Sequence, residues 1–354
     1  ICVVLTNLGV LSPVAGKPVT LLQSFVVTLA TPLLLLGADA RRVYRETGRL
    51  LLAFGLAALG TLLGSSLGFV LFKTQLLACG TDVWKLGAAL AAKNIGGGLN
   101  FVAVADSLSI SPTDISLGLA VDNLLGLMYF PFVSWLGRNE PKDQYEHEFL
   151  KQQGQSSNEA VTAEGTAVAL AVAAAITACS ERLSPLLAPL LGVPPAGARL
   201  PAATLLAVAA ATAAPEALRP AAASGEALGR VLLFLFFASV GASSGTVAGA
   251  LGSPAAGALL GAGLALYAVH LGLTLAAGRL LGLPLREVLV ASNASVGNAA
   301  TASALASTQG WQSLVVPAFL VGSTGNSVGT FLGLWLGTSV LRPIVLSVGG
   351  FVRP

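Results

Sequence analysis

Charged residues are scarce in this chain. They make up 10% of its 354 residues, whereas hydrophobic residues make up 55%. Soluble domains carry about a quarter charged residues, so this composition excludes an ordinary water-soluble protein. The solvent for most of the chain must therefore be a lipid bilayer. The formal net charge is only +3 and no nucleic-acid-binding motif is present, so no nucleic-acid partner is expected.

Cysteine is also scarce. Cys2, Cys79 and Cys179 lie far apart, without the spacing of a metal or redox motif, and we expect small buried residues and no cofactor. The segment GASSG, residues 241–245, fits the G-x-S-x-G pattern of hydrolases. That pattern needs a strand before the Ser, and here a Phe-rich helical run precedes it. We therefore expect no enzymatic activity.

Long apolar runs dominate what remains. They recur at lengths of about 17–25 residues, which is what a helix needs to cross about 30 Å of hydrocarbon. The short alternating segments of a barrel are absent. The sequence thus predicts an all-α polytopic membrane protein. A partial helix at 1–11 begins as though an upstream segment were missing, and spans are expected at about 19–37, 50–72, 84–106, 113–137, 165–190, 200–214, 228–248, 254–282, 285–307 and 312–340.

A polar stretch divides the chain. Residues 138–164 carry three basic and six acidic groups and are predicted to be a linker between two membrane repeats, 1–137 and 165–354. The earlier loop DARRVYRETGR, which starts at Asp39, is basic, and basic loops favour the cytoplasmic side. Counting spans forward then predicts the linker on the opposite face.

The two halves resemble each other. NIGGGLNFVAVADSL, from Asn94, and NASVGNAATASALAS, from Asn293, both join an Asn and small residues to an Ala-rich helical run. DNLLGLMYFPFVSWLG and GNSVGTFLGLWLG also correspond, with Asn123 opposite Asn326. We predict two inverted repeats of about five helices, each with a discontinuous helix crossing the other near the midplane. The repeats become parallel if 165–190, which Glu181, Arg182 and Pro185 interrupt, also crosses, so that segment could be re-entrant or lateral.

Interrupted hydrophobic segments at matching places in two halves indicate a transporter binding site. A helix can break in hydrocarbon only where protein or water satisfies the freed backbone groups, which Gly, Asn and Ser permit. Small residues also favour tight helix packing, so one such segment alone would indicate packing. The predicted substrate and ion site comprises Lys93, Asn94, Gly96, Gly97, Gly98, Asn100, Asp122, Asn123, Ser292, Asn293, Ser295, Gly297, Asn298, Thr301 and Asn326, with a candidate sodium site near Asn94, Asn293 and Asp122.

Charged and titratable residues within the spans sharpen this prediction. Lys93 precedes the first break, and a Lys at a helix centre costs roughly 2.5–3.5 kcal/mol, so it should face a partner or a cavity. Asp122 could neutralise Lys93, or the two could serve separately as ion or proton site and as anion ligand. His270 could relay protons or could simply pack with one hydrogen bond.

Several long motifs resemble the membrane family catalogued as domain of unknown function 819, in the family's order and over nearly the whole chain. They are PLLLLGADARRVYRETGRLLLAFGLAALGTLLG, NIGGGLNFVAVADSLSISP with DNLLGLMYF, and ASNASVGNAATASALASTQGWQSLVVPAFLVGSTGNSVGTFLG. That family is grouped with the cation:proton antiporter and anion transporter superfamily, which includes bile acid:sodium symporters. The resemblance implies a core domain with two crossed discontinuous helices that moves against a panel domain.

On this sequence, the crossed helices would contain Asn94 to Asn100 and Ser292 to Asn298. Lys93 departs from the pattern, since an uncharged residue is expected there. A fixed cation at that place could replace a bound sodium ion or hold an anionic substrate.

The leading hypothesis is a secondary active transporter of a small organic anion, coupled to sodium or protons and working by alternating access. A cation:proton antiporter, with Asp122 carrying the exchanged proton, and a non-transporting receptor or scaffold are the alternatives. The expected partners are the lipid bilayer, a small anionic substrate and a second copy in a homodimer. The Ala-rich chain fits a bacterial inner membrane or a plastid envelope membrane.

Overall fold

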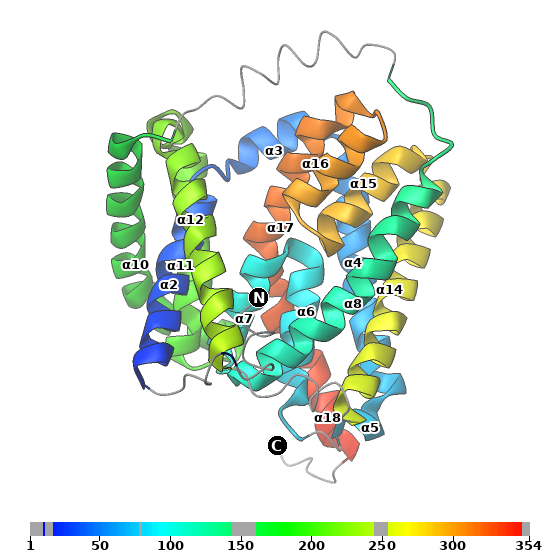
Figure 1. The fold of residues 1–354 in the computed structure, drawn as a ribbon, viewed down its shortest axis with the longest axis horizontal. Coiled ribbons are helices and arrows are strands. Elements are labelled where there is room, and N and C mark those ends of the chain that lie inside the picture. Colours follow the sequence, from blue (N-terminus) through cyan, green and yellow to red (C-terminus); the bar gives the residue numbers. More distant parts are fainter. Residues whose placement is uncertain (1–9, 11–16, 78–79, 144–160, 244–253, 349–354) are drawn as a thin grey trace.

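The computed structural model describes residues 10, 17–77, 80–143, 161–243 and 254–348, and every regular element within them is a helix (Figure 1). Within the described residues, seven helices are long and apolar enough to cross a membrane, or eight if one bent pair counts as a single span. The predicted all-α membrane protein is confirmed at this level. The partial helix at 1–11, Cys2 and Cys79 lie outside the described residues.

The helices before the linker are α2 (Lys17–Leu35), α3 (Ala40–Thr47), α4 (Arg49–Leu71), α5 (Lys73–Leu77), α6 (Val83–Gly96), α7 (Gly98–Ser107) and α8 (Pro112–Leu136). Those after it are α10 (Ala163–Leu191), the 3-10 helix η1 (Pro195–Ala198), α11 (Arg199–Ala213), α12 (Pro215–Ser243), α14 (Pro254–Leu280), α15 (Leu285–Val296), α16 (Ala299–Thr308), the 3-10 helix η2 (Gln312–Leu314), α17 (Val315–Leu336), the π-helical turn η3 (Gly337–Leu341) and α18 (Arg342–Val348).

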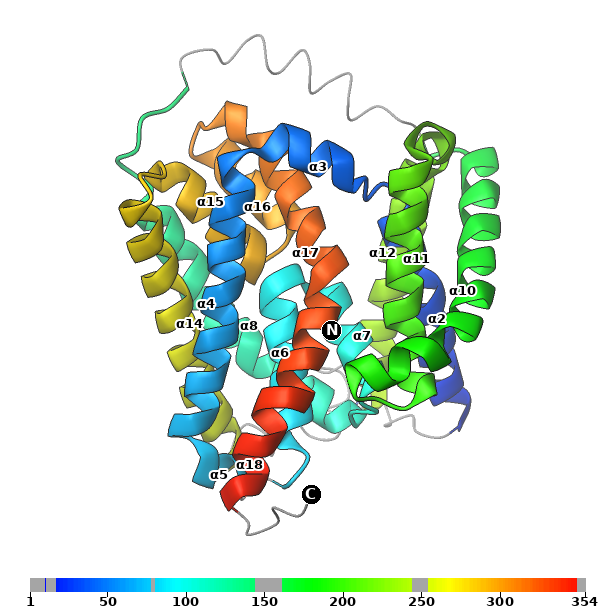
Figure 2. The ribbon, with the colours of Figure 1, turned by 180° about the vertical axis from the view of Figure 1, so that it is seen from behind.

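The helices form two bundles that lie side by side, as Figures 1 and 2 show from opposite sides. The first bundle consists of α2, α10, α11 and α12, with a small Leu- and Ala-rich core that Leu33 and Ala203 represent. The second bundle consists of α4 to α8 and α14 to α18, and its larger core contains Phe101 and Trp311. Leu99 of α7 packs into the core of the first bundle and links the two.

Glycines let α4 and α14 approach closely within the second bundle. Gly60, Gly64 and Gly68 lie one turn apart on α4 and face backbone atoms of α14 in antiparallel order. A side chain there could not be accommodated without moving the helices apart, which is how small residues drive membrane helix packing. A Cβ atom would lie 2.9 Å from His270 at Gly60, 2.6 Å from Leu266 at Gly64 and 2.5 Å from Ala262 at Gly68.

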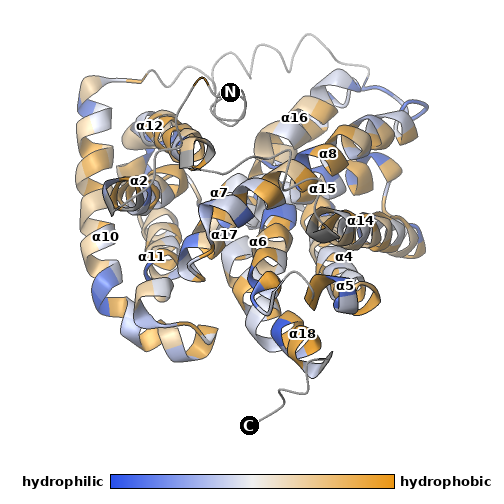
Figure 3. Cartoon of the chain, turned by 60° about the horizontal axis from the view of Figure 1, so that its bottom comes forward, coloured by the Kyte–Doolittle hydropathy of each residue, from blue (hydrophilic) through white to orange (hydrophobic). Residues whose placement is uncertain are grey.

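Hydrophobic residues, orange in Figure 3, occur along most of the helices. Helix α8 alone exposes Leu127, Met128, Phe132 and Trp135, of which Leu127 is 75% exposed. An exposed apolar area of this extent marks a surface that contacts lipid or another protein. The bilayer is therefore the environment of these helices, and the chain is an integral multi-pass membrane protein.

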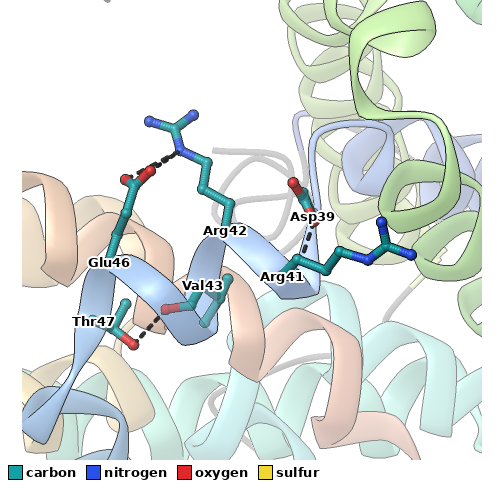
Figure 4. Close-up of polar contacts among 6 residues, drawn as sticks. All are labelled: Asp39, Arg41, Arg42, Val43, Glu46 and Thr47. Atoms are coloured by element: carbon teal, nitrogen blue, oxygen red, sulfur yellow. Dashed lines mark hydrogen bonds and ion pairs between the residues drawn. The ribbon is translucent and has the colours of Figure 1, made fainter.

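The basic loop after α2 forms the short helix α3 (Figure 4). Asp39 caps its first turn by accepting a hydrogen bond from the Arg41 amide at 2.9 Å, and Arg42 pairs with Glu46. Val43 and Thr47 are buried on the opposite side. The alternation of charged and buried positions makes α3 an amphipathic helix at one end of the molecule, as expected for a segment at a membrane surface.

Helix α10 settles the form of the least certain segment. Residues 163–191 form one continuous helix with Pro185 inside it and Glu181 and Arg182 on its exposed side, instead of a re-entrant segment. Cys179 is exposed on this helix, so its predicted burial is wrong.

Helix α12 begins well before the expected 228, because its charged residues pair along the helix surface, as Arg230 does with Glu226.

The segment 285–307 folds back on itself. Asp143 accepts a hydrogen bond from Arg286, at the start of α15, at 2.8 Å. The same carboxylate accepts hydrogen bonds from the amide of Ser313 at 2.8 Å and from its hydroxyl at 2.7 Å, just after α16. The chain therefore enters α15 and leaves α16 at the same end of the molecule, instead of traversing it.

The segment 84–106 folds back in the same way from the other end. Val83 at the start of α6 and Ile110 after α7 line one surface hollow. Because α6 and α7 return to their starting end, the expected number of crossings before the linker was one too high. The linker consequently starts on the same face as α3 and not on the opposite one, and both views place α3 and α16 together (Figures 1 and 2).

Candidate functional site

The two breaks meet in the middle of the second bundle. Helix α6 ends at Gly96 and α7 begins at Gly98, with Gly97 between them at φ +81°, a conformation that favours glycine. Helix α15 ends at Val296 and α16 begins at Ala299. A Cβ atom at Gly97 would lie 3.1 Å from both the Asn298 Cβ and the Gly297 carbonyl oxygen. The first break thus touches the second.

An ion pair lies one turn before the first break. The Lys93 ammonium contacts the Asp122 carboxylate, whose side chain is only 2% exposed. Asn94 donates from its Nδ2 atom to the other carboxylate oxygen at 3.2 Å and to the Leu90 carbonyl at 2.9 Å. A buried ion pair is marginal in net energy, but removing one partner strands a charge. Lys93 and Asp122 therefore depend on each other.

A small cavity lies beside this ion pair. Its volume is about 30 Å³, enough for about one or two water molecules or a single ion. Asp122, Asn94, Ser65 and Tyr267 contribute polar groups to its otherwise apolar lining. The Ser65 hydroxyl and the Asn94 side-chain oxygen are buried without a hydrogen-bond partner among the residues that the structure describes. Buried polar atoms normally have hydrogen-bond partners, so these two atoms are available to a ligand or a water molecule in the cavity.

A chain of hydrogen bonds joins the first break to the second. The Asn94 carbonyl accepts from Thr61 Oγ1 at 3.1 Å and from Ser295 Oγ at 2.8 Å. Thr61 Oγ1 also lies 2.8 Å from Nδ1 of His270, and Nε2 of His270 lies 2.9 Å from Ser292 Oγ. Ser292 in turn contacts the Tyr129 hydroxyl. Residues of α4 and α15 thus hold the carbonyl that the break frees, and His270 of α14 and Tyr129 of α8 extend the network.

Asn100 holds α7 against α17. Its Nδ2 atom donates to the carbonyls of Gly96 at 2.8 Å and Gly325 at 3.2 Å. Its Oδ1 atom accepts from the amide of Thr330 at 2.9 Å and from the hydroxyl of Thr330 at 2.7 Å. All four hydrogen-bonding positions of a side-chain amide are used. The residue therefore positions the backbone and has no free group for a substrate.

The second break is closed locally. The Asn298 side chain accepts from the Thr301 amide at 3.0 Å, and the Thr301 hydroxyl accepts from the Asn298 amide at 2.9 Å. This capping box satisfies two of the amides that a helix start leaves free. Asn293 is 3% exposed, and its side-chain oxygen has no partner among the described groups.

The sequence model of one family, described as "Protein of unknown function (DUF819)", matches residues 1–343. The chain is also 32% identical over 357 residues to the "Uncharacterized membrane protein YjcL" of Bacillus subtilis (strain 168), a match that covers 94% of this chain and 87% of that protein. This chain belongs to the DUF819 family. The resemblance that the motifs indicate is thereby confirmed for the family itself.

In this DUF819 protein, the predicted residues Asn123 and Asn326 do not line the cavity beside the ion pair. Asn123 follows Asp122 on α8, but the helix turns its side chain outward, and it is exposed. Asn326 is partly exposed on α17. Neighbouring residues of a helix point in directions about 100° apart, so one of two adjacent polar residues faces the bundle and the other does not.

Several polar residues that the structure brings to this place were not predicted from the sequence. They are Thr61 and Ser65 on α4, Tyr129 on α8, Tyr267 on α14 and Thr330 on α17. A single hydroxyl in an apolar run indicates packing as readily as function. The one local signal was the spacing of Thr61 and Ser65, which lie one turn apart within the Gly60, Gly64 and Gly68 stripe.

Proposed function

We propose that this protein is a secondary active transporter of a small organic anion, coupled to a sodium ion or a proton that binds at Asp122. Its two repeats are inverted, the bundle with the broken helices is the moving core, and α2, α10, α11 and α12 form the panel. The observation that carries the proposal is the Lys93–Asp122 ion pair beside a small polar cavity, one turn from the point where the breaks meet.

The folding of the two broken segments supports inverted repeats. One enters and leaves at one end of the molecule, as the contacts of Asp143 with Arg286 and Ser313 indicate, and the other does so at the opposite end. A folded-back segment adds no crossing, so α10 can cross and the halves still have opposite orientations. Breaks that meet from opposite ends place a site within reach of both faces, as alternating access requires.

The cavity supports the coupling ion. A hard monovalent cation prefers oxygen ligands, and Asp122, Asn94, Ser65 and Tyr267 all line the cavity. The proposed sodium site therefore keeps Asn94 and Asp122, omits Asn293, which does not line this cavity, and adds Ser65 and Tyr267. A proton on Asp122 would fill the same role, because either ion neutralises the carboxylate that Lys93 otherwise pairs with. Binding of either ion thus releases the Lys93 ammonium.

The anion would bind where α7 begins. The first turn of α7 has no side-chain cap, whereas Asn298 caps α16. Free amides and the positive end of a helix favour an anion, and a released Lys93 adds a positive charge one turn away. Gly98 at this place lies close to Phe237 of α12, where the two bundles meet. A site between bundles is suited to opening by movement of one against the other.

A cation:proton antiporter is the second candidate. The specific observation in its favour is that Asp122 already neutralises Lys93, so no fixed positive charge faces an anion in this state. In an antiporter, the cation and the proton would alternate at Asp122 and no anion would be needed.

Flux measurements on the purified protein in sealed vesicles would test the proposal. Saturable uptake of a carboxylate that depends on a sodium or proton gradient, and that Lys93→Met abolishes, is the expected result. Proton release on cation addition without any anion would favour the antiporter. No flux with any carboxylate or cation would contradict the proposal and favour a receptor or scaffold. Thr274→Val, which removes a buried hydroxyl bonded to its own helix, is the matched control.

A further inference from the structure

His270 is fully buried on α14, and the proposed transport cycle does not use it. Both of its ring nitrogens have partners on other helices: Thr61 of α4 at Nδ1 and Ser292 of α15 at Nε2. The backbone of α4 also approaches His270 at Gly60, where a Cβ would lie 2.9 Å from the His270 Cα. The imidazole is thus fixed between the helix that supports the first break and the helix that forms the second.

The positions of the hydrogen atoms in this hydrogen-bond network can be assigned by counting donors and acceptors. The Thr61 hydroxyl can donate to the carbonyl of Asn94 at 3.1 Å or of Ala57 at 3.2 Å, and neither carbonyl can donate back. Its oxygen then accepts from an Nδ1–H of His270, which leaves Nε2 as the acceptor of the neutral ring. Ser292 donates to Nε2 and accepts from the Tyr129 hydroxyl. Every donated hydrogen in this network then has an acceptor.

The other protonation states leave one hydrogen without an acceptor. If Nε2 carried the proton, Ser292 would accept from it and would donate to Tyr129. The Tyr129 hydroxyl would then have no acceptor among the side-chain hydrogen bonds of the described residues, although its side chain is only 4% exposed. A stranded buried donor costs about 1–3 kcal/mol. A charged imidazolium would strand the same hydroxyl and would add a buried charge.

We propose that His270 is a neutral, Nδ1-protonated positioning residue that transmits the state of Asp122 from the first broken helix to the second. Asn94 binds Asp122 through its side chain, and its carbonyl is held by Thr61 and by Ser295 of α15. When Asp122 changes partner, Asn94 and Thr61 move together, and His270 carries the displacement to Ser292. The role in transport rests on the proposed function, but the tautomer and the linkage do not.

Nitrogen-15 NMR of the histidine-labelled protein in detergent or lipid tests the tautomer directly. The chain has only two histidines, and His147→Gln leaves His270 as the single signal. The expected spectrum at neutral pH shows one protonated and one unprotonated nitrogen, with the proton on Nδ1. Protonation of Nε2, or of both nitrogens, would overturn the assignment.

Hydrogen–deuterium exchange tests the linkage. The coupling site is altered without a net charge change by combining Lys93→Met with Asp122→Leu, and exchange is read from a peptide covering residues 288–300. We expect exchange there to change by about threefold or more when His270 is present. The change should disappear in His270→Leu and persist in Thr274→Val, a buried variant one turn away on the same helix.

A second variant guards against misfolding. Ser292→Ala cuts the same bridge from α15, so it should also abolish the response if His270→Leu does not fold. The linkage would be overturned if the change in exchange persisted in both His270→Leu and Ser292→Ala. It would also be overturned if no change occurred in the protein with both residues intact. Exchange does not depend on transport, so absence of flux with an intact exchange response would overturn the proposed function and leave the linkage standing.

Discussion

The two broken segments have the same outline but different chemistry. In the repeat alignment, Lys93 and Asp122 of the first half correspond to Ser292 and Gly325 of the second. The first half of the chain therefore holds a buried ion pair beside a cavity, while the second half supplies hydroxyl groups and close backbone contacts. In the proposed repeat, the two copies thus share an outline, and the charged chemistry lies in one of them.

Residues of the second half stabilise the broken helix of the first half. Ser295 donates to the carbonyl of Asn94, and the Gly325 carbonyl accepts from Asn100 at the start of α7. Gly325 has no side chain, which lets α17 lie against the end of α6. The uncharged half is thus the support on which the charged half depends, and the following substitutions test that division.

Removal of Asp122 should have the largest effect. Asp122→Leu strands the Lys93 ammonium in the bundle and should lower the free energy of unfolding by about 3–5 kcal/mol. Adding Lys93→Met should restore most of that loss, since no charge then lacks a partner. Denaturant unfolding in detergent would measure both. Equal destabilisation of the single and double variants would show that the two side chains do not interact.

Filling the matching position of the second half should have an intermediate effect. In Gly325→Ala the added Cβ would lie 2.4 Å from the Ile95 carbonyl oxygen and 2.9 Å from the Gly96 Cα. Both atoms belong to the backbone at the first break, so α6 and α17 must separate, at about 1–3 kcal/mol. Gly272→Ala, where no atom lies within 4 Å, is the control and should be neutral or slightly stabilising. Equal melting temperatures for the two variants would contradict the packing argument.

Asp143, outside the spans, should have the smallest effect. Partial burial opposes its ionisation, but hydrogen bonds from Ser313 and Arg286 outweigh burial and lower the pKa of this carboxyl. Such a group stabilises the fold above its unfolded pKa of about 3.9, and the contribution is lost as the pH falls through the folded pKa. Asp143→Asn should therefore cost about 1–2 kcal/mol at pH 7.

The same variant makes a prediction about pH. The difference in stability between Asp143→Asn and the parent should shrink as the pH falls below about 4, because the parent carboxyl is then protonated too. Unfolding curves at several pH values would measure it. A difference that stays constant with pH would mean that the charge of Asp143 is irrelevant to the fold.

The sequence was sufficient to predict features that depend on neighbouring residues alone. Gly96, Gly97 and Gly98 predicted the first break, and Asn293, Gly297 and Asn298 the second, because a helix in lipid tolerates such residues only where its backbone is satisfied otherwise. Hydropathy located the spans but could not tell a traversing segment from one that folds back, because both are apolar. That ambiguity produced the wrong face for the linker.

The sequence was insufficient where the partners are distant. Ser65 on α4 and Tyr267 on α14 lie on helices that no local pattern brings to Asp122. Tyr129 lies on α8 with Asp122, but its partner Ser292 lies on α15, far away in the sequence. Only the packing of α4 against α14, which Gly60 and Gly64 permit, brings these helices together. The pairing of Lys93 with Asp122, one of the two alternatives that the sequence left open, required no such knowledge, since two opposite charges in adjacent spans have few other partners in a bilayer.

The most direct test of the central claim is the thermal stability of the purified protein against sodium, lithium and pH, with choline as the inert cation. An ion that binds the folded state at 100 times its dissociation constant should add about 2.7 kcal/mol of stability. The account predicts a rise in melting temperature with sodium or with protons that disappears when Lys93→Met and Asp122→Leu are combined. A shift that persists unchanged in the double variant, or none with any ion, would contradict a coupling site at Asp122.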